Sequence, residues 1–300
     1  MELATRDPRI VLLTGDLGYT VLEPFADRFP SRYFNVGVAE QNMIGAATGL
    51  AEAGFIPYVY SIATFASLRA YEFIRNGPVL HQLQVRIVGI GGGFEYGHAG
   101  PTHHGLEDVG VMRIQPGLTL LSPADHRQAG HAISSTSDLA GPVYYRLGKD
   151  DRTVVPGLEG RFRIGRVEVV ANGEDLLVVT AGAVATQAVL AAERLKDHGL
   201  SATVAVVSSF NPAPVEDLAQ LAAPCRLVLT VEAHYVTGGL GSLVAEVIAE
   251  RGLHCRLVRC GVRALATGRT GSAEYFHRVH GLTSEALVKT ALAAMDERSE

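Results

Sequence analysis

The chain has 300 residues, of which 47% are hydrophobic and 19% are charged, a composition typical of a globular protein with about two domains. The formal net charge of -5 and the absence of a Lys/Arg-rich run argue against a nucleic-acid partner. No apolar run reaches the roughly 18 residues that a membrane span requires. The N-terminus shows no signal-peptide pattern, and the three cysteines form no disulfide framework, so we expect a cytoplasmic protein.

Short apolar runs alternate with helical patterns in the first half of the chain. Strands are expected at 10–14, 85–91, 118–122 and 142–147, and helices at 39–53, 65–82 and 123–137. Such alternation predicts a parallel sheet covered by helices.

Residues 148–161 gather Gly, Pro and charged residues without periodicity, and the alternation then restarts. Strands are expected at 175–182, 202–209 and 226–233, and helices at 183–198, 214–222, 238–252 and 284–297. We therefore expect two open α/β domains with parallel or mixed sheets, residues 1–150 and 162–300, joined by a linker at 151–161.

Two glycine-rich stretches follow predicted strands. The stretch GIGGGFEYGHAGPTHHG (89–105) fits neither the dinucleotide fingerprint nor the phosphate-binding loop. The stretch GGLGS (238–242) opens a helix whose free backbone amides could hold an anion. A tight strand-to-helix turn is the simpler interpretation, so neither stretch assigns a function alone.

The segment GPTHHG (100–105) places two adjacent histidines, His103 and His104, in a loop after a strand. That end of an open α/β sheet is where ligands usually bind. Adjacent histidines cannot easily share one ion, and no Cys pair or HExxH helix accompanies them, so no metal site is predicted. Together with His98, they favour a loop that faces a substrate over a purely structural turn.

Glu40 opens the apolar helical run in NVGVAEQNMIGAATGLAEAGF (35–55). Burying a carboxylate without a partner costs several kcal/mol, so such an acid has either a partner or a function. An acid at a helix N-terminus also gains about 0.3–1 kcal/mol from the helix dipole. From the residues alone, the structural interpretation is favoured over the functional one.

Taken in chain order, these motifs resemble the transketolase family, and more closely the C-terminal half of transketolase as a free-standing subunit. The motifs are GDL (15–17), GVAEQN (37–42), TF (64–65), GPTHHGLEDVGVMR (100–113), SPAD (122–125) and GPVYYRLG (141–148). The resemblance covers essentially the whole chain and is most specific over 15–148. In the second half it rests mainly on VEAH (231–234) and GGLGS.

The resemblance implies an enzyme that uses thiamine diphosphate, with a pyrimidine-binding domain followed by a transketolase C-terminal-like domain. Glu40 falls on the family glutamate, which would hydrogen-bond a pyrimidine ring nitrogen and favour the imino tautomer. Phe65 and Tyr71 match the aromatic wall around the pyrimidine. Asp16 and Leu17 match residues near the cofactor across the subunit interface.

The resemblance also implies two substrate contacts. His103 matches the histidine that meets the donor's hydroxyls and has a catalytic role, and Arg146 matches an arginine that receives a sugar phosphate. His98 and His104 are further candidates for binding substrate.

Three positions depart from the family pattern. Ala99 stands in place of an aspartate that reads an acceptor hydroxyl, Gly91 in place of a substrate histidine, and Leu68 in place of a third aromatic residue. Chemistry at the cofactor is expected to survive these changes, whereas sugar specificity stays open.

The chain has no GDG…N motif, through which the family binds Mg²⁺ and the diphosphate. A partner subunit with that motif is therefore implied, in a dimer of heterodimers, with Mg²⁺ bound mainly by the partner. The leading function is transfer of a two-carbon ketol unit from a ketose or ketose phosphate to an aldehyde. The alternatives are the β subunit of a 2-oxo acid dehydrogenase's decarboxylating component, an enzyme like deoxyxylulose-phosphate synthase, and a non-catalytic scaffold. A scaffold would need none of Glu40, Phe65 and His103.

Overall fold

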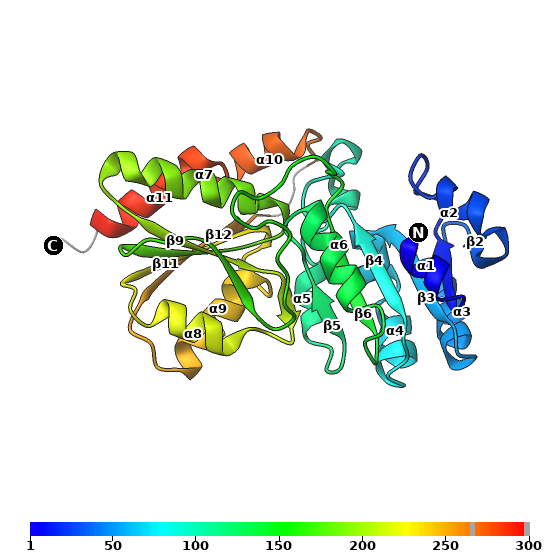
Figure 1. The fold of residues 1–300 in the computed structure, drawn as a ribbon. Helices are drawn as coiled ribbons and strands as arrows, with labels where there is room; N and C mark the ends of the chain where they lie inside the picture. The colour runs from blue at the N-terminus through cyan, green and yellow to red at the C-terminus, as the bar shows by residue number, and fades with distance from the viewer. Residues whose placement is uncertain (265–267, 297–300) are drawn as a thin grey trace.

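The computed structural model describes residues 1–264 and 268–296 and arranges them in two α/β lobes that lie side by side (Figure 1). One lobe is built on a seven-stranded sheet and the other on a five-stranded sheet. The predicted fold class, two open α/β domains with parallel or mixed sheets, is confirmed. Within the described residues, no helix is long and apolar enough to span a membrane.

The first sheet is parallel except for one edge strand. Its members are β1 (Ile10–Thr14), β2 (Tyr33–Asn35), β3 (Ile56–Ile62), β4 (Arg86–Ile90), β5 (Thr119–Leu121), β6 (Val143–Leu147) and β10 (Ser209–Asn211). They lie in the order β10-β5-β6-β4-β3-β1-β2, and β10 runs antiparallel to β5. Because β2 and β3 lie on opposite sides of β1, the strand order reverses there. Such a reversal leaves a crevice at the carboxyl ends of the strands, where ligands bind in folds of this kind.

Helices cover both faces of this sheet. One face carries α3 (Glu40–Glu52), α4 (Tyr71–Ile74) and α5 (Asp108–Arg113), and the other carries α1 (Glu2–Arg6), α2 (Glu23–Arg28) and α6 (His126–Ser135). Three short 3-10 turns complete the lobe, η1 (Pro30–Arg32), η4 (Gly97–Ala99) and η5 (Pro101–His103). Helix α3 packs through Met43, Ile44 and Ala47, which share one helix face and are almost fully buried. This packing fixes the position of Glu40 at its N-terminus.

The helical run predicted at 65–82 is present but contains two wide turns. π-helical segments η2 (Phe65–Arg69) and η3 (Arg75–Val79) flank α4. In η2 the Ser67 hydroxyl donates to the Ala63 carbonyl at 2.6 Å and so competes for the backbone acceptor. In η3, Pro78 has no N–H to donate. Wide turns of this kind often occur at functional sites, and η2 carries two side chains of the site described below.

The second lobe has a sheet with the order β12-β11-β8-β9-β7, in which β7 is antiparallel to β9. Its strands are β7 (Val167–Ala171), β8 (Leu176–Ala181), β9 (Ala202–Val207), β11 (Leu227–Tyr235) and β12 (Arg256–Val262). Its helices are α7 (Ala185–Leu195), α8 (Val215–Ala222), α9 (Leu240–Glu250), α10 (Ala273–Val279) and α11 (Ser284–Asp296), with 3-10 turns η6 (Gly182–Val184) and η7 (Lys196–His198). Alternate residues of β8 face opposite layers: Leu177 packs toward α8 and α9, and Leu176 toward α7 and α11.

Several strands were not anticipated. The central strand β3 carries Pro57, which normally marks an edge strand, but here the proline is only the second residue of the strand. Strand β12 lies at a sheet edge and carries Arg256 and Arg259, which interrupt an apolar pattern. Strand β10 is too short for periodicity to show it.

The two lobes are joined by more than the connecting chain. Strand β10 comes from the second half of the sequence but extends the first sheet. The Gly110 amide donates to His234 Nε2 at 3.2 Å, and Arg113 pairs with Glu246. These contacts join helix α5 of the first lobe to β11 and α9 of the second.

Candidate functional site

The site predicted from the sequence lies at the carboxyl ends of the strands of the first sheet. Asp16 follows β1, Glu40 follows β2, Phe65 follows β3, and His103 lies in the loop after β4. The fold brings Glu40, Phe65 and His103 into one cluster through the contacts described below.

Glu40 is the first residue of α3, and 1% of its surface is exposed. Ser61 Oγ donates to its Oε1 at 2.8 Å, and Arg69 Nη1 donates to its Oε2 at 2.6 Å. The carboxylate is therefore a buried charge with a cation and a hydroxyl as partners, which explains how it tolerates burial.

Arg69 connects Glu40 to the aromatic part of the site. Its guanidinium carbon lies 4.4 Å from the centroid of the Phe65 ring, a cation–π contact. The His103 ring packs against the same phenyl ring in a T-shaped arrangement, at a centroid distance of 5.0 Å. The Nδ1 atom of His103 is hydrogen-bonded to Thr102 Oγ1 at 2.9 Å. Because both Phe65 and Arg69 lie on η2, this wide turn determines the shape of the cluster.

The loop after β1 forms the rim of the site. Asp16 is exposed and has a positive φ of 59°, and it accepts hydrogen bonds from Asn35 Nδ2 at 2.8 Å and Tyr19 Oη at 2.9 Å. These two bonds hold the pKa of Asp16 below its usual value. The carbonyl of Leu17 accepts from Thr14 Oγ1 at 2.8 Å, which ties the loop back to β1.

The remaining residues assigned to the pyrimidine wall and the substrate differ in their surroundings. Tyr71 is the half-buried first residue of α4, and His98 is exposed on η4. His104 is 3% exposed and packs edge-on against Phe94 and Phe276 at centroid distances of 5.2 and 4.9 Å. Burial lowers the pKa of His104. His104 is therefore a loop residue, as expected, but its side chain is buried in an aromatic cluster.

Arg146 is largely committed to partners within the chain. Its Nε donates to both oxygens of Asp108, at 2.9 and 3.2 Å, and its Nη2 donates to the carbonyls of Gly105 and Ala233, each at 3.0 Å. Asp108 is fully buried and 8% of Arg146 is exposed. A side chain at position 92 would lie 2.6 Å from the guanidinium carbon, so the glycine there makes room for Arg146. Only its Nη1 edge has no hydrogen bond to the described residues.

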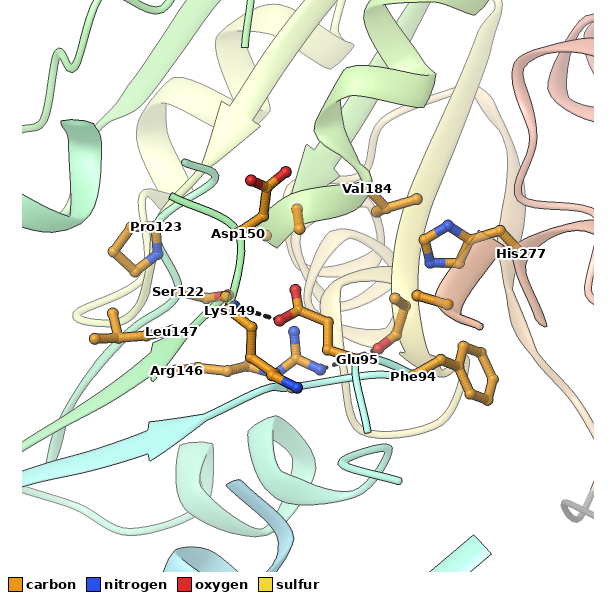
Figure 2. Close-up of a pocket in the computed structure, with 16 residues that line it drawn as sticks. Phe94, Glu95, Ser122, Pro123, Arg146, Leu147, Lys149, Asp150, Val184 and His277 are labelled. Carbon is orange, nitrogen blue, oxygen red and sulfur yellow. Dashed lines mark hydrogen bonds between the residues drawn. The ribbon is translucent and has the colours of Figure 1, made fainter. Parts of the chain in front are cut away.

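A cavity of about 390 Å³ lies between the lobes beside this pair (Figure 2). The charged and titratable residues that line it are Glu95, Arg146, Lys149, Asp150 and His277. The Lys149 side chain is exposed, and its Nζ lies 4.0 Å from the centroid of the Tyr96 ring. The Glu95 carboxylate accepts the backbone amide of Lys149, and burial raises the pKa of Glu95. Lys149 is thus a cation held at the cavity without an ion pair to any described residue.

The helix N-terminus at GGLGS is already occupied by a carboxyl group of the chain itself. Oε2 of Glu232 accepts the Leu240 amide at 2.7 Å, and Oε1 accepts the Gly241 amide at 2.8 Å. A Cβ at Gly239 would lie 2.0 Å from Oε2, which requires glycine there. The motif therefore has a structural role.

Glu232 should make the stability of the fold depend on pH. Burial raises its pKa to about 7, whereas the two backbone amides act in the opposite direction. Since this value lies above that of an unfolded glutamate, the folded state binds the proton more tightly. Its contribution to stability is full below about pH 4.5 and is lost as the pH rises through 7. Urea unfolding at pH 5 and pH 8 should give a decrease of about 2–3 kcal/mol that depends on Glu232. In Glu232→Gln this part of the decrease should disappear, and an identical pH dependence in both proteins would contradict the assignment.

Four residues of the candidate site were not predicted from the sequence: Ser61, Arg69, Asp108 and Lys149. Ser61 and Asp108 are buried, and their types give no signal in a strand or a helix. Arg69 follows Phe65 by four residues, which is a common helical spacing. Lys149 follows Arg146 by three residues, and what distinguishes the two cations, the burial and ion pair of Arg146, depends on Asp108 far away in the sequence. Among the described residues, no group of three His, Cys, Asp or Glu side chains is placed to hold a metal.

The fold and the cluster around Glu40 define an α/β protein of two lobes, with a buried carboxylate near an aromatic ring at the carboxyl edge of a largely parallel sheet. The family model "Transketolase, pyrimidine binding domain" matches residues 1–153, and "Transketolase, C-terminal domain" matches residues 165–287. The chain therefore belongs to the transketolase family, whose enzymes depend on thiamine diphosphate, and it corresponds to the C-terminal section of those proteins.

Individual relatives agree with this assignment. The chain is 37% identical to a "Putative transketolase C-terminal section" of Methanocaldococcus jannaschii, over 98% of this chain and 93% of that protein. It is 34% identical to a subunit of the apulose-4-phosphate transketolase of Phocaeicola vulgatus, over 97% of this chain and 93% of the relative. Among solved structures, a "Split gene transketolase, inactive beta4 tetramer" superposes with a TM-score of 0.87 at 35% identity, covering 98% of this chain and 94% of that chain. The chain thus resembles subunits of split transketolases over nearly their full length.

Proposed function

We propose that the chain is the pyrimidine-binding subunit of a two-component transketolase that transfers a two-carbon ketol unit from a ketose or ketose phosphate to an aldehyde. The observation that carries the proposal is the cluster of Glu40, Phe65 and His103 at the carboxyl edge of the first sheet. A buried carboxylate beside an aromatic ring fits an aminopyrimidine, because the carboxyl can bond a ring nitrogen while the phenyl ring stacks on the heterocycle. The planar guanidinium of Arg69 in this position supports that fit.

Thiamine diphosphate supplies a carbon nucleophile that can add to a ketose carbonyl. The chain's own contribution begins with Glu40, which would hold or release a proton at the pyrimidine nitrogen. Ser61 holds Oε1 of Glu40 in place, so Oε2, which accepts from Arg69 in this structure, would be the oxygen that bonds the ring nitrogen. His103, held by Thr102 and by its T-shaped contact with Phe65, would donate to a hydroxyl of the donor sugar.

Lys149 is our candidate for the cation that binds the substrate's anionic group. The predicted ligand, Arg146, already neutralises Asp108 and donates to two carbonyls. Lys149 lies three residues farther along, at the same cavity, with its ammonium group on the Tyr96 ring and free to bind. A phosphate would therefore meet an unpaired charge at Lys149 but only one guanidinium edge at Arg146.

A partner subunit is part of the proposal, since the diphosphate and Mg²⁺ need the GDG…N motif that this chain lacks. Apolar side chains exposed around the site support a docking face there. Val38 precedes Glu40 and is 69% exposed, and Leu68 and Phe73 are each 41% exposed. The outer side of α3 carries the small exposed residues Gly45, Ala46 and Gly49, which permit close approach of another helix. We propose a dimer of heterodimers with the site between subunits.

Reconstitution tests the function. The purified chain should bind thiamine diphosphate with Mg²⁺ negligibly in a calorimetric titration, because the diphosphate has no site in it. After assembly with an N-terminal transketolase subunit carrying GDG…N, the complex should bind the cofactor and transfer ketol units from ketoses to aldehydes. A panel of ketoses, 2-oxo acids and aldehydes separates this activity from that of a 2-oxo acid dehydrogenase component or a deoxyxylulose-phosphate synthase. Micromolar cofactor binding or turnover by the single chain would contradict the proposal.

A further inference from the structure

We infer that Arg69 is an internal stand-in for the cofactor's aminopyrimidine ring. In the chain by itself, its guanidinium binds Glu40 and lies on Phe65, and it must leave before the ring can dock. The inference rests on the proposed function, because it takes Glu40 and Phe65 as the pyrimidine site.

The contacts of Arg69 are those that an aminopyrimidine needs. Its Nη1 is 2.6 Å from Glu40 Oε2, and its guanidinium carbon is 4.4 Å from the Phe65 centroid. A guanidinium and a protonated aminopyrimidine are both flat, delocalised groups that donate N–H bonds in their plane and stack on an aromatic ring. Since Ser61 already donates to Oε1, Arg69 and the ring would compete for Oε2 of Glu40 and for the same aromatic face.

Arg69 is also placed so that it can leave. Its side chain is 37% exposed, whereas that of Glu40 is 1% exposed. Glu40 is its one hydrogen-bond partner among residues 1–264 and 268–296. Rotation of a long, unbranched side chain would therefore carry the guanidinium into solvent while the backbone of η2 stays in place.

The exchange has two consequences. Without the cofactor, Arg69 is the cation that pairs with the buried Glu40 carboxylate. If Arg69 were absent, the unpaired buried charge would lower the stability of the fold. With the cofactor, the ring must displace Arg69, so the apparent affinity is lowered by the fraction of molecules in which the site is open. Arg69 is thus a positioning residue that couples stability of the empty subunit to cofactor binding.

The test uses Arg69→Met, since methionine keeps an apolar stem against Phe65 but has neither charge nor donors. Arg75→Met is the matched control, because Arg75 is exposed on the same helical run and its Nη1 bonds only the neighbouring Asn76, at 2.7 Å. For the purified chain without cofactor, Arg69→Met should lower Tm by about 3–6 °C. The double variant with Glu40→Gln should recover most of this loss, since no buried charge remains. Arg75→Met should not change Tm.

The second measurement is the Kd of thiamine diphosphate with Mg²⁺, by calorimetry on the chain assembled with an N-terminal subunit. Arg69→Met should tighten binding about fivefold or more, because a competitor is gone. An unchanged Tm, or an unchanged or weaker affinity, would overturn the stand-in role. If instead Glu40→Gln binds the cofactor as tightly as the wild type, the proposed pyrimidine site itself is wrong, whatever Arg69 does.

Discussion

Glu40→Gln should leave the chain folded and able to assemble but should lower turnover of the assembled enzyme by about a hundredfold or more. Glutamine has the size of glutamate, and its carbonyl can still accept from Ser61 or Arg69. It cannot hold or release the proton that the proposed reaction places between the carboxyl group and the pyrimidine nitrogen. The loss therefore belongs to the chemical step and should appear in kcat.

The measurement compares steady-state rates of the reconstituted complex at saturating cofactor, with circular dichroism and gel filtration to verify folding and assembly. Glu52→Gln is a matched control, because Glu52 is the exposed last residue of the same helix α3. It should retain wild-type turnover. More than about a tenth of wild-type turnover in an assembled Glu40→Gln enzyme would count decisively against the proposed role.

The sequence predicted the regular part of this molecule well because the physics there is local. The apolar run at 10–14 is strand β1 without change of bounds, and the Met43–Ile44–Ala47 spacing is the buried face of α3. Strand β10 has three residues and pairs with β5, a segment about 90 residues earlier, so no local pattern could reveal it. Periodicity thus missed β10 because its pairing is long-range, and it missed β3 and β12 because a proline and two arginines interrupt their patterns.

The candidate site likewise has residues that local motifs single out and pairings that depend on the fold. The sequence singles out three candidates, Glu40, Phe65 and His103, because each lies in a motif of its own, and the fold places them together. The ion pair of Arg69 with Glu40 joins residues 29 positions apart and depends on a wide turn that has no sequence signature. Likewise, the partner of Arg146, Asp108, is 38 positions away. Sequence identifies which groups are chemically able to act, but only the fold shows which of them are already paired.

The pairing of Arg146 with Asp108 leads to the second large effect, on stability. Arg146→Met should lower the free energy of unfolding by about 3–5 kcal/mol, because Asp108 is fully buried and would lose its cation. The carbonyls of Gly105 and Ala233 would lose a donor as well. Because Ala233 lies in β11 of the second lobe, the variant should also loosen the contact between the lobes. Urea unfolding at neutral pH measures the effect, and the double variant Asp108→Leu/Arg146→Met should be more stable than Arg146→Met, since no buried charge remains.

Lys149→Met is the matching variant for the other cation at the cavity. Comparison of the two variants distinguishes a cation that stabilises the fold from one that binds the substrate. Lys149 is exposed, and removing its charge leaves no buried partner, so stability should stay within about 0.5 kcal/mol of wild type. Its KM for a phosphorylated ketose should rise about tenfold, equivalent to about 1.4 kcal/mol, while that for the unphosphorylated ketose should hardly change. In the opposite result, Arg146→Met keeps its stability and is the one variant that raises KM for the phosphorylated donor. Arg146 would then be the phosphate ligand, and Lys149 would have no part in binding the substrate.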